Sequence, residues 1–278
     1  MLTLLALGVA LALPVSADTV MPVSRGDALA LETPSGSVTV QVWGRDQVQL
    51  QGGGSLRRTG RTLRLDGRSA RTPRHETLTV TVPAWLDVSL EGRELDVSVD
   101  GVSGSLRVRT LSGEVWLTRI AGETDVRSVS GEVTVRGISG RTSLWTVEGD
   151  VDVADGTGTL MVQSTDGDLV LQDIAADELS AETTDGDVLF GGSVPRGARL
   201  RLATHDGDIT ATIPRNADVE VSVSTFDGAF EPAMPVQTRG LRAGEALMFV
   251  IGRGGATLSM QAFDGDIRLR HAVGDGGR

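Results

Sequence analysis

The chain has 278 residues, enough for one large or two small domains, and 40% of them are hydrophobic, which is sufficient to build a core. Its formal net charge of −11 argues against general, non-specific binding of nucleic acid, because proteins bind the phosphate backbone through basic side chains. The absence of cysteine excludes disulfide bonds, so the fold depends on packing and backbone hydrogen bonds.

Residues 1–17, MLTLLALGVALALPVSA, have the pattern of a secretory signal peptide. An apolar run is broken by Pro14 and followed by small residues that end at Ala17. The run is shorter than the roughly 20 residues of a transmembrane helix. We therefore expect cleavage before Asp18, no membrane span in the mature chain, and export to the periplasm or the cell exterior.

Residues 18–100 contain irregularly spaced strand patterns separated by glycine-rich and arginine-rich turns. We expect this part to be an N-terminal β cap, because the open end of a repetitive β stack is a site of aggregation. The expected strands are 37–43, 48–51, 62–65, 76–82 and 86–90.

A repeat of 18 residues begins at Gly104. Four consecutive units are GSLRVRTLSGEVWLTRIA (104–121), GETDVRSVSGEVTVRGIS (122–139), GRTSLWTVEGDVDVADGT (140–157) and GTLMVQSTDGDLVLQDIA (158–175). Within each unit apolar and polar residues alternate, which indicates two short half-buried strands and two turns. Later the spacing loosens, but the signature returns as TDGDV, HDGDI, FDGAF and FDGDI.

A short fixed period predicts a stacked architecture rather than a globular enzyme fold. We expect an all-β, single-stranded β-solenoid of about 18-residue coils over residues 101–270, with parallel ladders between equivalent positions. An antiparallel β meander or sandwich is the alternative, although it explains less well why whole units repeat. Residues 271–278 are expected to form a disordered tail.

Each unit contains a turn at a glycine between polar or acidic residues, because glycine accepts positive φ. These structural turn glycines are Gly113, Gly131, Gly149, Gly167, Gly186, Gly207 and Gly265. Carboxylates follow them and would lie about 4.8 Å apart in stacked coils. Turn geometry and solubility account for this acidic column, so we expect no cofactor. If the column binds a cation such as Ca²⁺, the candidates are Asp168, Asp187 and Asp208.

No pattern of catalytic residues is found, and we expect no enzymatic activity. The three histidines have unrelated contexts, and HExxH, P-loop and GxSxG motifs are absent. Trp116 and Trp145 fall at positions phased toward solvent and are the candidate aromatic contacts for a partner.

The sequence resembles a bacterial family of β-strand repeats of unknown function whose members are described as adhesins. The resemblance rests on residues 75–117, the SGEV, EGDV and DGDL repeats, and residues 205–230, and it covers roughly residues 35 to 270. It implies an exported repetitive β scaffold and brings no catalytic residues with it.

Three hypotheses for function follow. The first is a non-enzymatic adhesin or envelope-associated binding protein whose partner is a protein or carbohydrate surface. The second is a carbohydrate-active enzyme on a β-helix, which needs clustered carboxylates in a groove. The third is a structural protein that self-assembles end to end. The oligomeric state stays open at this stage.

Overall fold

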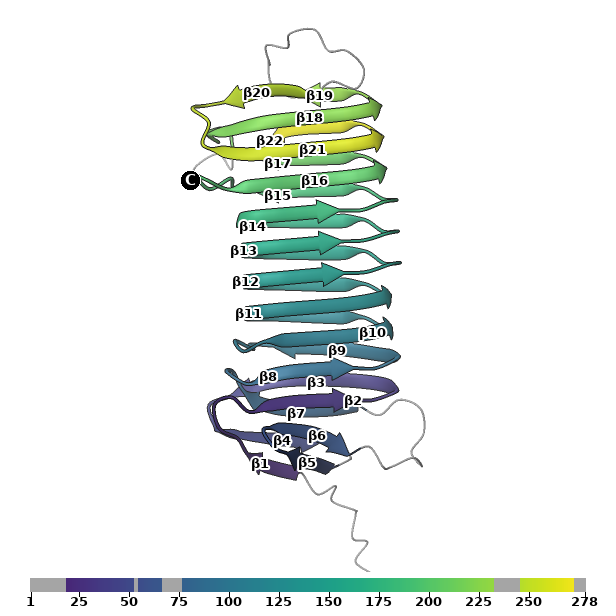
Figure 1. The fold of residues 1–278 in the computed structure, drawn as a ribbon, viewed down its shortest axis with the longest axis vertical. Helices are drawn as coiled ribbons and strands as arrows, with labels where there is room; N and C mark the ends of the chain where they lie inside the picture. The colour runs from purple at the N-terminus through teal and green to yellow at the C-terminus, as the bar shows by residue number, and fades with distance from the viewer. Residues whose placement is uncertain (1–18, 53–54, 67–76, 233–245, 273–278) are drawn as a thin grey trace, which may run out of the picture.

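Alternating apolar and polar residues form short strands that stack in parallel into a long two-sided β-solenoid (Figure 1). The structure is a computed structural model and describes residues 19–52, 55–66, 77–232 and 246–272. It is all β within those ranges, and they contain no helix that could cross a membrane. The expected signal peptide, residues 1–17, lies outside the described residues.

The central coils follow the repeat. Their strands are β10 (Leu106–Ser112), β11 (Val115–Ser130), β12 (Val133–Trp145), β13 (Val151–Gln163), β14 (Leu169–Glu182) and β15 (Val188–Gly192). Each long strand runs along one sheet and then bends into the other, so one unit contributes to both sheets. Parallel pairing joins residues 18 apart, such as Val115 with Val133 and Val126 with Leu144. One extra residue enters β14 near Asp177, where the register shifts.

The core lies between the two sheets. The sheet that precedes the acidic turn points one column of side chains inward: Val108, Val126, Leu144 and Val162. The sheet that follows the turn contributes a second column: Leu117, Val135, Val153 and Leu171. All eight side chains are at most 1% exposed. Most of the intervening positions are exposed or half-buried, with Thr134 an exception at 2% exposed, so the predicted inward register is confirmed. Equivalent residues form continuous apolar columns, which is the reason that the coils stack.

The N-terminal end contains nine strands. They are β1 (Thr19–Pro22), β2 (Ala28–Glu32), β3 (Ser35–Trp43), β4 (Gln47–Gln51), β5 (Ser55–Thr59), β6 (Thr62–Asp66), β7 (Thr77–Pro83), β8 (Asp87–Glu91) and β9 (Glu94–Asp100). The coil of β2 and β3 pairs in parallel with β8 and β9 on one side and with β6 and β7 on the other. The coil of β6 and β7 is therefore farther out than β2 and β3, which precede it in the chain.

The C-terminal end repeats this arrangement. Its strands are β16 (Arg199–Asp206), β17 (Ile209–Ile213), β18 (Val219–Asp227), β19 (Phe230–Pro232), β20 (Leu247–Ile251), β21 (Ala256–Asp264) and β22 (Ile267–His271). The coil of β21 and β22 stacks directly on β16 and β17. The coil of β18 and β19 lies beyond it, and the antiparallel strand β20 follows on β18. Spatial order therefore differs from chain order at both ends.

Two expected boundaries need correction. No change of fold occurs at residue 100, because the parallel solenoid register already joins β2 to β8 and β8 to β10. Among the described residues, the antiparallel pairs at the N-terminal end are β1 with β4, β4 with β7 and β5 with β6. At the other end, His271 is the last residue of β22 and does not belong to a tail. Residues 273–278 lie outside the described part of the chain.

Candidate functional site

The acidic turns line one edge of the solenoid. The seven glycines named above have φ between +116° and +148°. At Gly167, a Cβ would lie 2.4 Å from the carbonyl oxygen of Gly149 in the preceding coil. The close stacking of backbones therefore requires glycine there, in addition to its positive φ. Buried hydroxyl groups donate hydrogen bonds to backbone carbonyls of the turns. For example, Thr204 Oγ1 donates to the Gly186 carbonyl at 2.9 Å.

The aspartates after these glycines form a carboxylate ladder of Asp150, Asp168, Asp187, Asp208 and Asp266. Each Oδ1 accepts a hydrogen bond from the backbone N–H of the equivalent residue in the next coil. The distances are 2.9 Å from Asp168 N to Asp150, 2.8 Å for each of the next three bonds, and 2.9 Å from Ala229 N to Asp266. The carboxylates thus satisfy corner amides that the β ladder leaves unpaired.

This structural role was missed by the sequence analysis, which assigned the carboxylates to turn geometry and solubility. The available signal was the change from glutamate to aspartate along the column. Glu114 accepts a hydrogen bond from Trp116 Nε1 at 3.2 Å, and Glu132 accepts one from Thr134 Oγ1 at 3.0 Å. The shorter aspartate side chain reaches the next coil's amide, as it does at Asp150, Asp168, Asp187, Asp208 and Asp266.

An arginine neutralises the far end of the carboxylate ladder. The Arg268 guanidinium bonds Oδ2 of both Asp208 and Asp266, and its Nε donates to Glu231 at 3.3 Å. The Arg268 hydrogen bond, helped by the backbone N–H of Asp266, holds the pKa of Asp208 below its usual value. The same contact raises the pKa of Arg268.

The cation candidates Asp168, Asp187 and Asp208 each commit one oxygen to a backbone amide. Asp208 also commits its second oxygen to Arg268. In the described ranges, no group of three or more acidic, histidine or cysteine side chains is arranged to hold a metal ion. The geometry of the column therefore points to coil-to-coil bonding.

The two candidate tryptophans are both exposed, Trp116 by 45% and Trp145 by 40%. They lie on different sheets, because Trp116 follows an acidic turn and Trp145 precedes one. Trp145 lies between Arg127 and Gln163 of the neighbouring coils. The structure therefore does not bring the two tryptophans together into one contact surface.

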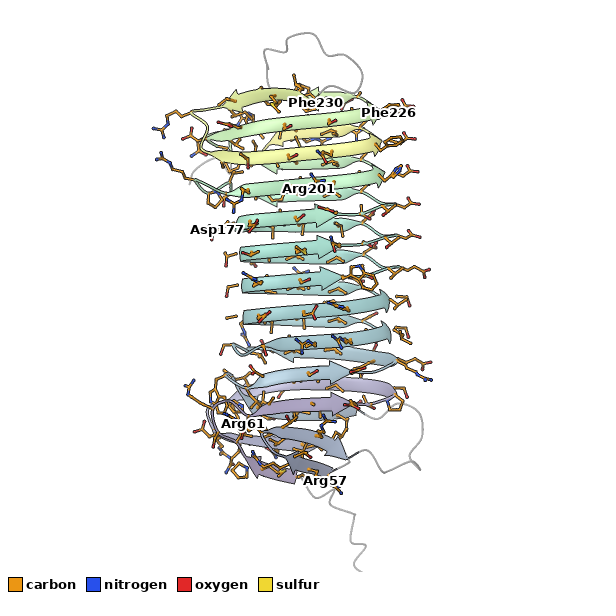
Figure 2. All side chains as sticks on the ribbon, in the orientation of Figure 1. Arg57, Arg61, Asp177, Arg201, Phe226 and Phe230 are labelled. Atoms are coloured by element: carbon orange, nitrogen blue, oxygen red, sulfur yellow. The ribbon has the colours of Figure 1, made fainter. Side chains whose placement is uncertain are left out.

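A second exposed aromatic group was not identified from the sequence. His205, Phe263 and Phe226 occupy equivalent positions in three stacked coils and form what we call the aromatic column. The His205 and Phe263 ring centroids are 4.7 Å apart, and the Phe263 and Phe226 centroids are 4.9 Å apart. Figure 2 shows Phe226 projecting from the edge opposite Asp177, near the C-terminal end of the stack.

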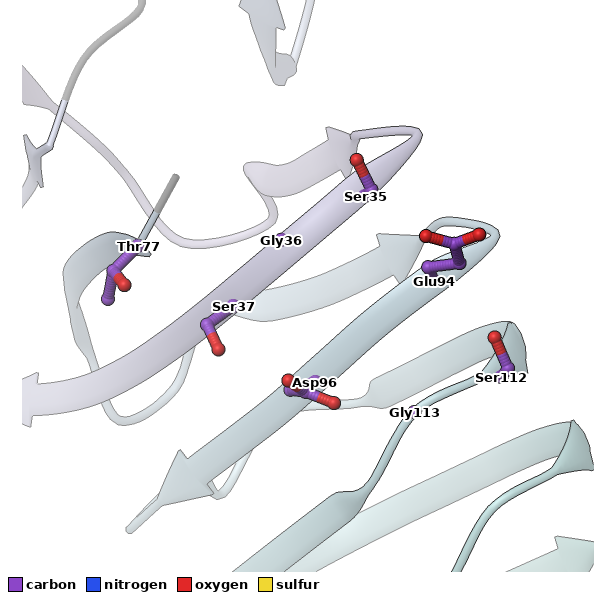
Figure 3. Close-up of a pocket in the computed structure, with 8 residues that line it drawn as sticks. All are labelled: Ser35, Gly36, Ser37, Thr77, Glu94, Asp96, Ser112 and Gly113. Carbon is purple, nitrogen blue, oxygen red and sulfur yellow. The ribbon is translucent and has the colours of Figure 1, made fainter. Parts of the chain in front are cut away.

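The same edge is hollowed near the N-terminal end (Figure 3). A cavity of about 480 Å³ is lined by Ser35, Gly36, Ser37, Thr77, Glu94, Asp96, Ser112 and Gly113. At this level buried Leu95 replaces the column's glycine, so β9 starts without the usual corner. Asp96 Oδ1 accepts a hydrogen bond from Glu114 N at 3.1 Å. The hollow is polar, and one of its two carboxylates is bound to the backbone.

A family model matches residues 21–270 of the chain. The chain belongs to the Toastrack DUF4097 family. This confirms the resemblance to a family of unknown function that the repeats indicated. No curated protein sequence matches the chain.

Several solved structures are similar to this Toastrack chain. A candidate cell adhesion protein from Clostridium sporogenes is 8% identical, with a TM-score of 0.28 over 92% of this chain and 99% of that one. A candidate adhesin from Bacteroides fragilis is 11% identical, with a TM-score of 0.36 over 91% and 96%. A candidate adhesin from Parabacteroides distasonis is 10% identical, with a TM-score of 0.41 over 91% and 97%.

Proposed function

We propose that this chain is an exported, non-enzymatic β scaffold that binds a partner surface, as an adhesin or an envelope-associated binding protein. The observation that carries the proposal is the aromatic column. Phe226 is 66% exposed and Phe263 is 50% exposed at the rim of an otherwise well-packed solenoid. Clustered exposed apolar side chains on a soluble protein mark interaction surfaces.

The two alternatives have less support. A carbohydrate-active enzyme needs two carboxylates free to act on substrate. In the hollow, Asp96 is engaged by a backbone amide, and Glu94 is the other carboxylate among the described lining residues. End-to-end assembly by continued parallel stacking of coils needs a parallel coil at each end, whereas β20 and β4 pair antiparallel with the outermost coils. A closed scaffold with a binding edge fits these observations better.

Two measurements test the proposal together. Cells expressing the full chain are fractionated, and the intact mass of the exported protein is measured by mass spectrometry. We expect a mature chain that begins at Asp18, in the periplasm or outside the cell. Beads coated with this mature protein are then passed over surfaces that carry envelope proteins or polysaccharides. We expect the surfaces to retain the beads, and we expect no soluble product to be released from the polysaccharides. An unprocessed cytoplasmic chain, or product release from a polysaccharide, would overturn the proposal.

A further inference from the structure

The aromatic column is assembled by the coil order of the C-terminal end. Phe263 of β21 lies between His205 of β16 and Phe226 of β18, because β21 pairs with both strands. The Phe226 and Phe263 rings are nearly parallel, with an interplanar angle of 5°, and the His205 ring is tilted by 56° against Phe263. The three rings thus form one continuous ridge along the edge.

The ridge is specific to this end of the solenoid. The equivalent position in the central coils is Val147, Thr165 and Thr184, which are smaller side chains. The Phe226 and Phe263 rings stack face to face, and the His205 ring tilts against the other side of Phe263, so Phe263 turns mainly its ring edge toward solvent. A flat sugar ring therefore cannot stack on Phe263, whereas apolar side chains of a polypeptide can pack along the ridge.

Each ring of the aromatic column is followed in the chain by an exposed aspartate. These are Asp206, Asp264 and Asp227, which lie in register with one another. Their carboxylates have no hydrogen bond or ion pair to the described residues, in contrast to Asp208 and Asp266, which Arg268 neutralises. The ridge is thus flanked by a row of uncompensated negative charge.

We infer that the aromatic column and its three aspartates form a docking surface for a basic polypeptide segment that also carries apolar side chains. This inference rests on the proposed function as a binding scaffold. Guanidinium and ammonium groups complement the carboxylates, while apolar side chains cover the rings. Edge-to-edge pairing with a second copy of this chain does not fit, because it brings the same negative charges into contact. The row spans about 10 Å, since neighbouring coils are about 4.8 Å apart, and an extended segment with basic residues at alternate positions, about 7 Å apart, places two of them over it.

The test uses the intact mature chain and three fluorescein-labelled octapeptides. One has four repeats of Arg-Leu, one has four of Arg-Ser, and one has four of Glu-Leu. Fluorescence anisotropy at two salt concentrations measures each Kd. We expect the Arg-Leu peptide to bind most tightly and the Glu-Leu peptide not to bind. Salt should weaken the Arg-Leu complex, because exposed charges are screened.

Matched variants locate the binding. The double variant Phe226→Ser with Phe263→Ser should raise the Kd of the Arg-Leu peptide about tenfold, as expected for exposed aromatic anchors. Its control is Leu111→Ser with Val129→Ser, at the same coil position toward the other end, where we expect no change. Likewise Asp206→Asn, Asp227→Asn and Asp264→Asn together should weaken binding. The control is a triple variant at the same position of the central coils, which should leave the Kd unchanged: Glu148→Gln, Asp166→Asn and Asp185→Asn.

Equal Kd values for the aromatic variant and its control would overturn the docking surface, provided that both melt at the wild-type temperature. The bead assay separates this failure from failure of the scaffold proposal. Retention of wild-type and Phe226→Ser/Phe263→Ser beads to the same extent leaves a binding scaffold but overturns this surface as its site. Loss of bead retention in the aromatic variant alone supports both.

Discussion

The central coils and the two ends of the solenoid are built from the same strands and turns but differ in how the chain orders them. From Gly104 to Gly158, residues 18 apart stack directly and each coil follows its predecessor. At both ends the outermost coil precedes an inner coil in sequence. At the N-terminal end the chain forms the coil of β2 and β3, then the outermost coil of β6 and β7, and then β8 and β9 on the inner side. At the C-terminal end it forms the outermost coil of β18 and β19 before the coil of β21 and β22, which lies between that coil and β16 and β17.

This difference shows that a parallel register can stay intact while connectivity changes. Moving a coil outward leaves a long connection, and the antiparallel strands β4 and β20 lie on the outermost coils. The parallel stacking register is thereby not continued beyond β7 and β18 where β4 and β20 pair with them. The same rearrangement places Phe263 beside both His205 and Phe226, so closure of the C-terminal end also builds the aromatic column.

The largest expected effect tests the core of the central coils. Val126→Asp should lower the free energy of unfolding by about 4 kcal/mol, because it buries an unpaired charge between the two sheets. Arg127→Ser, one residue away on the exposed side, should change it by about 0.5 kcal/mol or less. Urea denaturation of both variants makes the comparison, and equal losses would contradict the inward register.

A glycine pair compares the stacked edge with a loop near the C-terminal end. Gly167→Ala should cost about 3 kcal/mol, because its Cβ meets the Gly149 carbonyl and its φ is +148°. Gly197 has φ +84° but open space around it, so Gly197→Ala should cost only about 1 kcal/mol. Thermal unfolding of both variants measures the gap. A cost at Gly197 as large as that at Gly167 would show that backbone conformation alone sets the effect.

The carboxylate ladder gives a smaller effect. Asp168→Ala removes the acceptor for the Asp187 N–H and should cost about 1 kcal/mol, whereas Asp168→Asn keeps an acceptor oxygen and should cost less. Asp166→Ala, two residues earlier and exposed, should be close to neutral. Chemical denaturation resolves the three variants. Equal stability of Asp168→Ala and Asp166→Ala would show that the hydrogen bonds of the carboxylate ladder do not stabilise the fold.

A pH series gives the smallest effect and concerns the C-terminal end. The pKa of Asp208 is lowered in the folded state, chiefly by Arg268, so its contribution is present above the unfolded value of about 4 and is lost as pH falls through the folded pKa. The stability difference between wild type and Arg268→Gln should therefore shrink from pH 5 to pH 2. Arg270→Gln is the control, and we expect a pH-independent difference there. A constant difference for Arg268→Gln would contradict the assignment.

Much of the fold could be predicted from the sequence because the period was short and regular. The alternation in residues 104–175 was sufficient to predict which columns are buried and that they stack. The coil order at the ends could not be predicted. The strands 199–206, 219–227 and 256–264 carry similar patterns, and any two of them satisfy the same parallel ladder. The pattern does not specify which one lies in the middle.

The candidate site was predictable only in part, for the same reason. The turn glycines and the acidic column follow from one unit at a time. The carboxylate ladder depends on side-chain length, which was visible as the change from Glu132 to Asp150 but was not used. The aromatic column depends on adjacency between coils far apart in sequence. The motifs HDGDI, FDGAF and FDGDI were noted, yet their aromatic residues become neighbours only once the coil order is known.

The coil order can be tested directly by disulfide formation, because the chain has no cysteine of its own. Ser259 pairs with Arg201 on one side and with Ser222 on the other. Neighbouring coils place Cα atoms within about 4.4–6.8 Å, the range of a disulfide, whereas alternate coils are about 10 Å apart. Under mild oxidation, the double variant Arg201→Cys with Ser259→Cys should cross-link, and Arg201→Cys with Ser222→Cys should not. Cross-linking of the second pair without the first would mean that the coils follow chain order, and it would contradict the account.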